Sequence, residues 1–134
     1  MISVAMAERL ERAGVRWRPR DGDRFCLRAA GFAGEVFTVA EMVIEVREHP
    51  TGTLLAFNGT TECSLDSVQV EQALWLPSEG QLRELLGGAF HSLRRTPAGQ
   101  FQVLAGVGPE PTAFAAPTAP DAYAEALLGL IGAD

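Results

Sequence analysis

The sequence contains no lysine, so all eleven of its basic residues are arginines. A Schiff-base enzyme or a lysine-based acyl transferase needs a lysine amine, and a P-loop needs the lysine of G-x-x-x-x-G-K-[ST]. The absence of lysine therefore excludes a Schiff-base enzyme, a lysine-based acyl transferase and a P-loop NTPase. The pattern Gly31-Phe32-Ala33-Gly34 is not a dinucleotide-binding fingerprint, because no long βαβ unit surrounds it.

Cysteine and histidine are also scarce, with two of each in the chain. Cys26, Cys63, His49 and His91 show none of the short spacings that are typical of zinc ligands. No cysteine–histidine pair is favoured as a nucleophile and its base. The two distant cysteines are interpreted as buried thiols. We therefore predict no metal, no cofactor and no enzymatic activity.

Long hydrophobic runs are absent, and so is a basic segment at the N-terminus. The first apolar run is interrupted at Glu8 and Arg9, before it reaches the length of a signal-peptide core. The longest later candidate, Ala122 to Ala133, contains Glu125 and is shorter than the roughly 18 residues of a membrane span. We expect a cytoplasmic protein without a membrane partner.

The 134 residues are 47% hydrophobic, which suits one α+β domain over residues 1–134 with a real core. The formal net charge is -6, and it is distributed unevenly. Residues 1–30 carry seven arginines against four acidic residues, whereas the remainder carries four against thirteen. Because the acidic remainder would repel phosphate, we predict no nucleic-acid partner.

Three segments have the cap residues and apolar spacing of helices. The first is expected from Ser3 to about Ala13, with Gly14 as its stop. The second begins at Ser78 with the capping box Ser78-Glu79-Gly80-Gln81 and ends at Gly87-Gly88. The third begins at Thr118, and its buried apolar stripe is expected to consist of Tyr123, Leu127, Leu130 and Ile131.

Alternating and turn-bounded segments predict strands between these helices. The expected strands are 24–28, 42–47, 53–57, 90–95, 100–105 and 112–115, with 62–65 as a candidate further strand and the turn His49-Pro50-Thr51-Gly52 closing a hairpin. The predicted fold is α+β, an antiparallel sheet with three helices packed on it. The expected order is α-β-β-β-α-β-β-(β)-α.

One polar cluster could bind a small ligand, and it contains Thr60, Glu62, Ser64 and Asp66. Hydroxyls beside carboxylates can coordinate a substrate, and this is the basis of the alternative hypothesis, a small enzyme or ligand-binding protein. The same residue types cap turns and helix starts, which is the interpretation that the sequence favours.

Two apolar groups could contact another protein. Trp75 and Leu76, just before the second helix, are candidate anchors for a partner or a hydrophobic staple onto Leu82. In the third helix, Tyr123 and Leu127 belong to a wide apolar face that a domain of this size would cover on one side only. We predict a protein partner, most simply a second copy of the chain in a homodimer.

Several segments, in order along most of the chain, carry a resemblance: AERLERAG (7–14), GDRF (22–25), EVF (35–37), FNGTTE (57–62), LDSV (65–68), ALWLP (73–77), QLRELL (81–86) and DAYA (121–124). They resemble a family of short uncharacterised bacterial proteins that commonly carry the name pilus assembly protein CpaE. The resemblance implies membership of that family and implies no activity, ligand or functional residue.

The expected element order also resembles that of type III secretion chaperones and YbjN-like proteins, which bind other proteins, usually as dimers. This is a similarity of element order only. Together with the missing catalytic residues and the acidic charge, it favours a non-enzymatic protein-binding module, chaperone-like or regulatory.

Overall fold

The computed structural model describes residues 1–28, 34–39, 44–49, 52–57 and 67–132. The chain divides into two compact units: unit 1 comprises Met1–Arg16 and Pro77–Asp134, and unit 2 comprises Trp17–Leu76. The prediction that residues 1–134 form a single domain is not tested by this division and stays a prediction.

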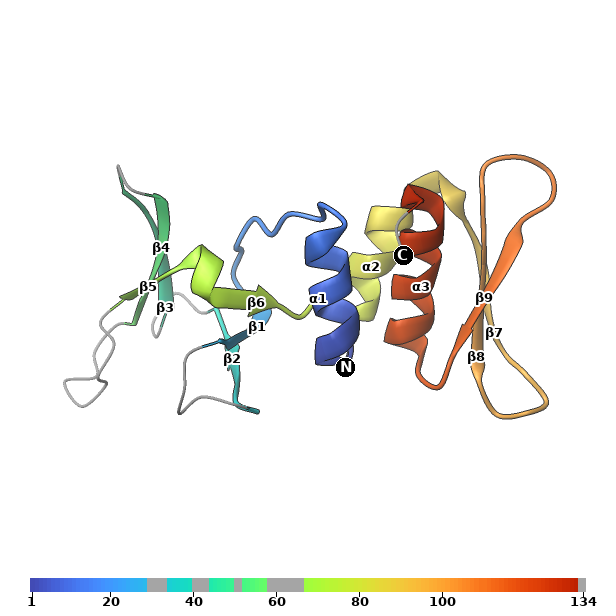
Figure 1. The fold of residues 1–134 in the computed structure, drawn as a ribbon, viewed down its shortest axis with the longest axis horizontal. Helices are drawn as coiled ribbons and strands as arrows, with labels where there is room; N and C mark the ends of the chain where they lie inside the picture. Colours follow the sequence, from blue (N-terminus) through green and yellow to red (C-terminus); the bar gives the residue numbers. More distant parts are fainter. Residues whose placement is uncertain (29–33, 40–43, 50–51, 58–66, 133–134) are drawn as a thin grey trace. The chain divides into compact units, whose positions relative to one another are not determined.

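Unit 1 contains three α-helices and one three-stranded antiparallel sheet among its described residues. The helices are α1 (Val4–Arg12), α2 (Glu79–Leu86) and α3 (Ala119–Ile131), and a 3-10 turn, η2 (Gly87–Ala89), follows α2. The strands β7 (Phe90–Arg95), β8 (Phe101–Ala105) and β9 (Thr112–Ala116) pair in chain order, so that β7 and β9 are the outer strands (Figure 1).

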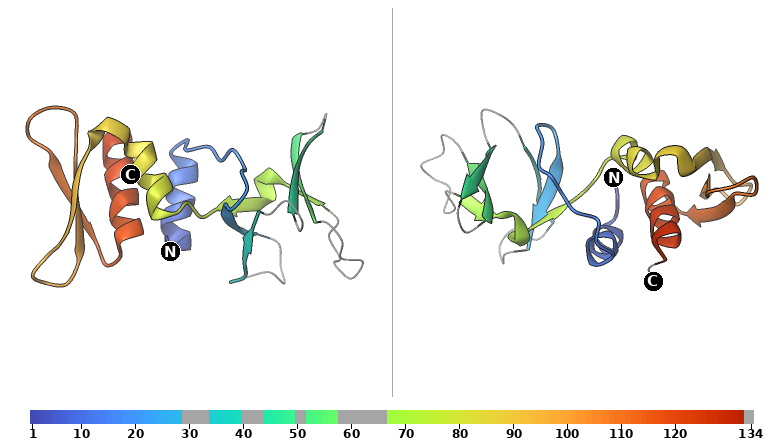
Figure 2. Two further views of the ribbon diagram at one scale, coloured as in Figure 1. Left: turned by 180° about the vertical axis from the view of Figure 1, so that it is seen from behind. Right: turned by 90° about the horizontal axis from the view of Figure 1, so that it is seen from above.

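Helix α3 is the centre of unit 1. It packs on β8 and β9, on α1 and on α2, and both views of Figure 2 show it between α1 and the β7–β9 sheet. From Ala119 to Leu128 every residue is buried except Asp121 and Glu125. The alanines on this helix allow such close approach on several sides because they add no side-chain bulk.

The one-sided cover expected for this helix is therefore wrong over the segment from Ala119 to Leu128. Of the stripe expected to be buried, Tyr123 and Leu127 are buried, with exposed fractions of 3% and 6%, whereas Leu130 and Ile131 are exposed. The alanines of the other sides are buried as well, because α1 covers α3 in addition to α2 and the sheet. Within α3, large apolar side chains are exposed only in the last turn.

In unit 2, the described residues form two further three-stranded antiparallel sheets. In the first, the central strand β1 (Arg24–Leu27) pairs with β2 (Val36–Thr38) and β6 (Ala73–Trp75). In the second, β4 (Gly52–Phe57) pairs with β3 (Ile44–His49) and β5 (Ser67–Gln69). A 3-10 turn, η1 (Val70–Gln72), connects β5 to β6.

The core of the first sheet combines a cluster of aromatic rings with buried aliphatic side chains such as Leu27 and Leu74. Phe25 is fully buried, and its ring lies 5.4 Å from that of Trp17 and 5.6 Å from that of Phe37. Next to these rings, the buried Asp23 accepts a hydrogen bond from Trp17 Nε1 at 2.9 Å and another from the Arg20 amide at 3.0 Å. The carboxylate thereby fixes the turn that leads into β1.

The α+β class and the antiparallel pairing are confirmed, and the expected element order fits approximately. Ser3, Ser78 and Thr118 cap the three helices as predicted, and the hairpin pairs His49 with Gly52. The candidate strand at 62–65 lies outside the described residues. The difference is in the middle of the chain. Between α1 and α2 the described residues form six strands, in two separate sheets, rather than the three strands of the expected order.

Candidate functional site

The four residues predicted to contact a partner are divided between the two units. In unit 2, Trp75 is the last residue of the edge strand β6, where it pairs with Phe25 and is half-buried. The next residue, Leu76, is buried. In unit 1, Tyr123 and Leu127 are buried in α3. The exposed apolar surface of unit 1 therefore consists of other side chains.

The predicted ligand-binding residues Thr60, Glu62, Ser64 and Asp66 lie outside the described residues. The alternative hypothesis that rests on them, an enzyme or a ligand-binding protein, stays a hypothesis. Among the described residues, no three histidine, cysteine, aspartate or glutamate side chains gather in a way that could hold a metal ion.

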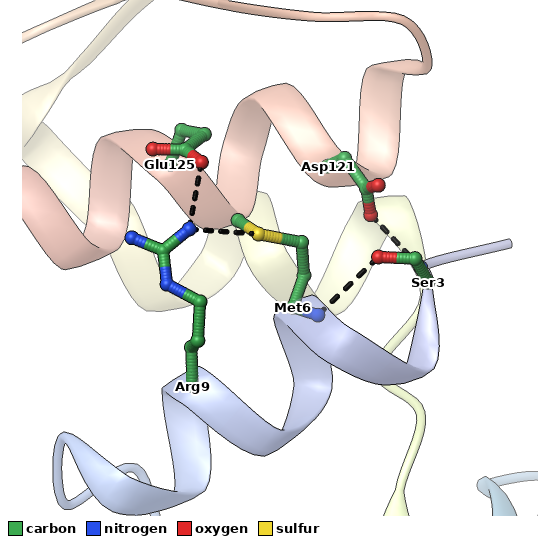
Figure 3. A network of polar contacts seen from close by, with 5 residues as sticks. All are labelled: Ser3, Met6, Arg9, Asp121 and Glu125. Atoms are coloured by element: carbon green, nitrogen blue, oxygen red, sulfur yellow. Dashed lines mark hydrogen bonds and ion pairs between the residues drawn. The ribbon is translucent and has the colours of Figure 1, made fainter. Parts of the chain in front are cut away.

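A polar network joins α1 to α3 (Figure 3). The Ser3 amide donates to Asp121 Oδ1 at 2.9 Å, and the Ser3 hydroxyl in turn caps α1 by accepting from the Met6 amide at 3.3 Å. Arg9 Nη1 lies 2.9 Å from Glu125 Oε1 and 3.2 Å from Met6 Sδ. These contacts use the only two residues of α3 between Ala119 and Leu128 that are not buried.

This network orients α1 on α3 rather than forming an open site. Its acidic partners are both satisfied, and the arginine also contacts a buried methionine. Sequence reasoning missed it because Ser3 and Asp121 are separated by 118 positions. The only local signal was the i, i+4 spacing of Asp121 and Glu125, which places both carboxylates on one side of the helix.

Beside this network, Tyr123 lies near charged residues of α2. Its ring is 5.7 Å from that of Phe90, and the Arg83 guanidinium lies 5.8 Å from the Phe90 ring centre. Burial raises the pKa of Tyr123 above 10.0, the nearby Arg83 lowers it, and Glu79 raises it. The phenol is therefore held in its neutral form more firmly than a free tyrosine.

The surface of unit 1 carries large apolar side chains at several helix ends. In the last turn of α3, Leu130 is 41% exposed and Ile131 is 49% exposed. Leu85 in the last turn of α2 and Val4 in the first turn of α1 are exposed to a similar degree. Burying such side chains against a partner would contribute about 1.5–3 kcal/mol for each complete burial, and proportionally less for these partly exposed ones.

In unit 2, the indole Nε1 of Trp75 is buried and has no hydrogen-bond partner within the described part of the chain. An unpaired buried N–H costs about 1–3 kcal/mol relative to a paired one. The Trp17 indole, by contrast, is paired to Asp23.

Among the described residues, no helix combines the length and the apolar character that crossing a bilayer requires. No protein-family model, no curated protein and no solved structure matches this chain.

Proposed function

We propose that this chain is a non-enzymatic protein-binding module, chaperone-like or regulatory, and that unit 1 supplies a binding surface. The observation that carries the proposal is the change along α3. The helix is buried on nearly all sides up to Leu128 and then exposes Leu130 and Ile131 in its last turn. An apolar helix end of this kind suits contact with another protein.

The surroundings of this turn support the same proposal. Helix α3 begins with a threonine cap and ends at Gly132, which adopts a left-handed conformation with φ 82°. Both ends are therefore well formed, and Leu130 and Ile131 belong to a complete helical turn. A partner would meet side chains whose backbone is already ordered, which lowers the entropic cost of binding.

The test is affinity capture from an extract of the source cell, with the full chain immobilised and retained proteins identified by mass spectrometry. The double variant Leu130→Ser, Ile131→Ser is compared with Val107→Ser. Val107 is also apolar and is 97% exposed, but it lies in the loop between β8 and β9.

We expect at least one protein to be retained by the wild type and by the Val107 variant and lost with the α3 double variant. That protein, purified, should bind the wild type at least tenfold more tightly than the double variant, a difference of about 1.4 kcal/mol. If the same proteins are retained by all three baits, α3 is not the binding surface and the proposal is wrong.

A further inference from the structure

The two outer strands of the β7–β9 sheet differ in how they are protected against pairing with another strand. The strand β7 carries Arg94 and Arg95, both exposed, and its register with β8 shifts between Phe90 and Ser92. Charged side chains and register irregularities are the features by which natural proteins prevent edge strands from adding further strands. The β7 edge therefore has two such features.

The strand β9 has neither of them. Its sequence, Thr112-Ala113-Phe114-Ala115-Ala116, contains no charge, and it pairs with β8 in an unbroken register over all five residues. Ala113 and Ala115 are exposed. On its other side β9 has no strand partner among the described residues, so alternate backbone N–H and C=O groups there remain unpaired within the structure as described.

We propose that the β9 edge binds a second copy of this chain, with the two β9 strands antiparallel about a two-fold axis at Phe114. The proposal rests on the proposed function, because it names one partner of a protein-binding module. It would join two three-stranded sheets into one continuous sheet.

The register follows from strand geometry. In an antiparallel pair, two directly opposed residues either both point their N–H and C=O groups toward the other strand or both point them away from it. Along one strand these two orientations alternate. The two positions of each pair must therefore both be odd or both be even. Centring the pair on Phe114 meets this condition and opposes Thr112 with Ala116 and Ala113 with Ala115 of the second copy. It is the self-pairing that uses all five residues of β9.

The side chains and charges also suit a second copy. Ala113 and Ala115 share one face of the sheet, where methyl groups would meet methyl groups without steric conflict. The nearest acidic residues, Glu110 and Asp121, lie outside the paired segment, and Glu110 would stand opposite the uncharged Thr118. The self-pairing therefore avoids direct like-charge contact in a chain whose net charge is -6.

The other face of β9 would gain apolar cover. Phe114 is half-buried, and its ring lies against Gly129 of α3, where any side chain would collide with the ring. In the pair, the two Phe114 residues would oppose each other beneath the two α3 helices, because α3 packs on β8 and β9. The exposed part of the ring would thereby be removed from water.

The first experiment is light scattering of the full chain over a micromolar dilution series. We expect a mass of about twice 14.3 kDa at the higher concentrations. A mass of 14.3 kDa throughout would overturn the second-copy proposal and leave the proposed function intact, since that function is tested at Leu130 and Ile131 with another protein.

Two double variants then test the interface itself. Ala113→Lys with Ala115→Lys places lysine opposite lysine twice in the proposed register, and it should raise the dimer dissociation constant by about tenfold or more. Ala113→Lys with Ala115→Glu changes the same two exposed positions but places opposite charges face to face, and it should remain dimeric.

Circular dichroism of both variants checks that unit 1 remains folded. If the two variants dissociate to the same extent, or if both remain dimeric, the proposed pairing of β9 is wrong.

Discussion

Units 1 and 2 build their cores around different elements. In unit 1, aliphatic side chains from separate elements, such as Leu10, Leu82 and Val103, surround α3, a helix whose alanines are buried. In the described part of unit 2, one ring, Phe25, connects two other aromatic residues beside a buried carboxylate. The core of unit 1 is therefore built around a helix, whereas the described core of unit 2 is built around the ring of Phe25 on β1, with aliphatic side chains such as Leu27 and Leu74 beside it.

The two units can also be observed separately. Both tryptophans, Trp17 and Trp75, belong to unit 2, whereas the single tyrosine and all three α-helices belong to unit 1. Tryptophan fluorescence therefore reports on unit 2, and helical circular dichroism reports on unit 1. Coincident unfolding transitions by the two probes would support the predicted single domain.

The largest effect is expected for Phe25→Ala. The side chain is fully buried between two rings, so its removal should lower the free energy of unfolding by about 3–5 kcal/mol. Because contacts cluster within each unit, the fluorescence transition in urea should shift more than the helical transition.

Leu82→Ala provides the reverse comparison, since Leu82 is equally buried but belongs to unit 1. It should lower the stability of the helical transition by about 2–5 kcal/mol and affect fluorescence less. Equal shifts of both probes in both variants would show that the division into separately stabilised units is wrong.

The next effect concerns the buried carboxylate of unit 2. Asp23→Ala leaves Trp17 Nε1 and the Arg20 amide without their acceptor and should destabilise the fluorescence transition by about 1–3 kcal/mol. Asp23→Asn keeps one acceptor oxygen and should cost less. Equal losses in the two variants would mean that these hydrogen bonds do not account for the contribution of Asp23.

Gly129→Ala tests the closest packing in unit 1. The added methyl group would collide with Cε1 and Cζ of Phe114, so the ring must move, at a net cost of about 1 kcal/mol in the helical transition. In a Phe114→Ala background the same change should instead stabilise the helix by up to about 1 kcal/mol, because alanine favours helix more than glycine does. The same sign in both backgrounds would contradict this account.

Ser78→Ala should lower the stability of unit 1 by about 1 kcal/mol, because the capping box at the start of α2 loses its hydroxyl. In the structure, Ser78 Oγ accepts from the Gln81 amide at 3.2 Å and Gln81 Oε1 accepts from the Ser78 amide at 3.0 Å. Thr96→Ala is a control, because that exposed hydroxyl caps a turn rather than a helix. If both variants lose the same free energy of unfolding, the helix cap at Ser78 does not stabilise the protein more than the turn cap at Thr96 does.

The capping box also shows which parts of this fold could be predicted. The caps at Ser3, Ser78 and Thr118 use partners three residues away, so the sequence contains the whole interaction. The strands β7 to β9 were equally accessible, because short turns connect consecutive partners. Local sequence patterns and local structure agree in these elements.

The remaining features depend on distant partners. The strand β6 pairs with β1 across nearly fifty positions, and its three residues show no alternation that a local pattern could detect. The cover on all sides of α3 depends on α1, which comes from the other end of the chain. The open edge of β9 was also missed, because a sequence shows the lack of charge but not which strand is outermost.

The smallest effect at neutral pH is expected for Tyr123→Phe, and it should grow at alkaline pH. Burial raises the pKa of Tyr123 above 10.0, against the opposing effect of Arg83, so the folded protein binds this proton more tightly than the unfolded chain. The resulting stability is complete below the ordinary tyrosine pKa and is lost as the pH rises through the higher folded value. Because phenylalanine cannot ionise, the Tyr123→Phe variant shows no such loss of stability at alkaline pH.

The measurement is urea unfolding by helical circular dichroism from about pH 8 to about pH 11. The wild type should lose stability relative to Tyr123→Phe in the upper half of that range. The chain offers a clean background, because it has no lysine and no second tyrosine to titrate there, and the cysteine thiols are common to both proteins. A constant difference between the two proteins across the range would show that Tyr123 ionises as freely as in the unfolded chain.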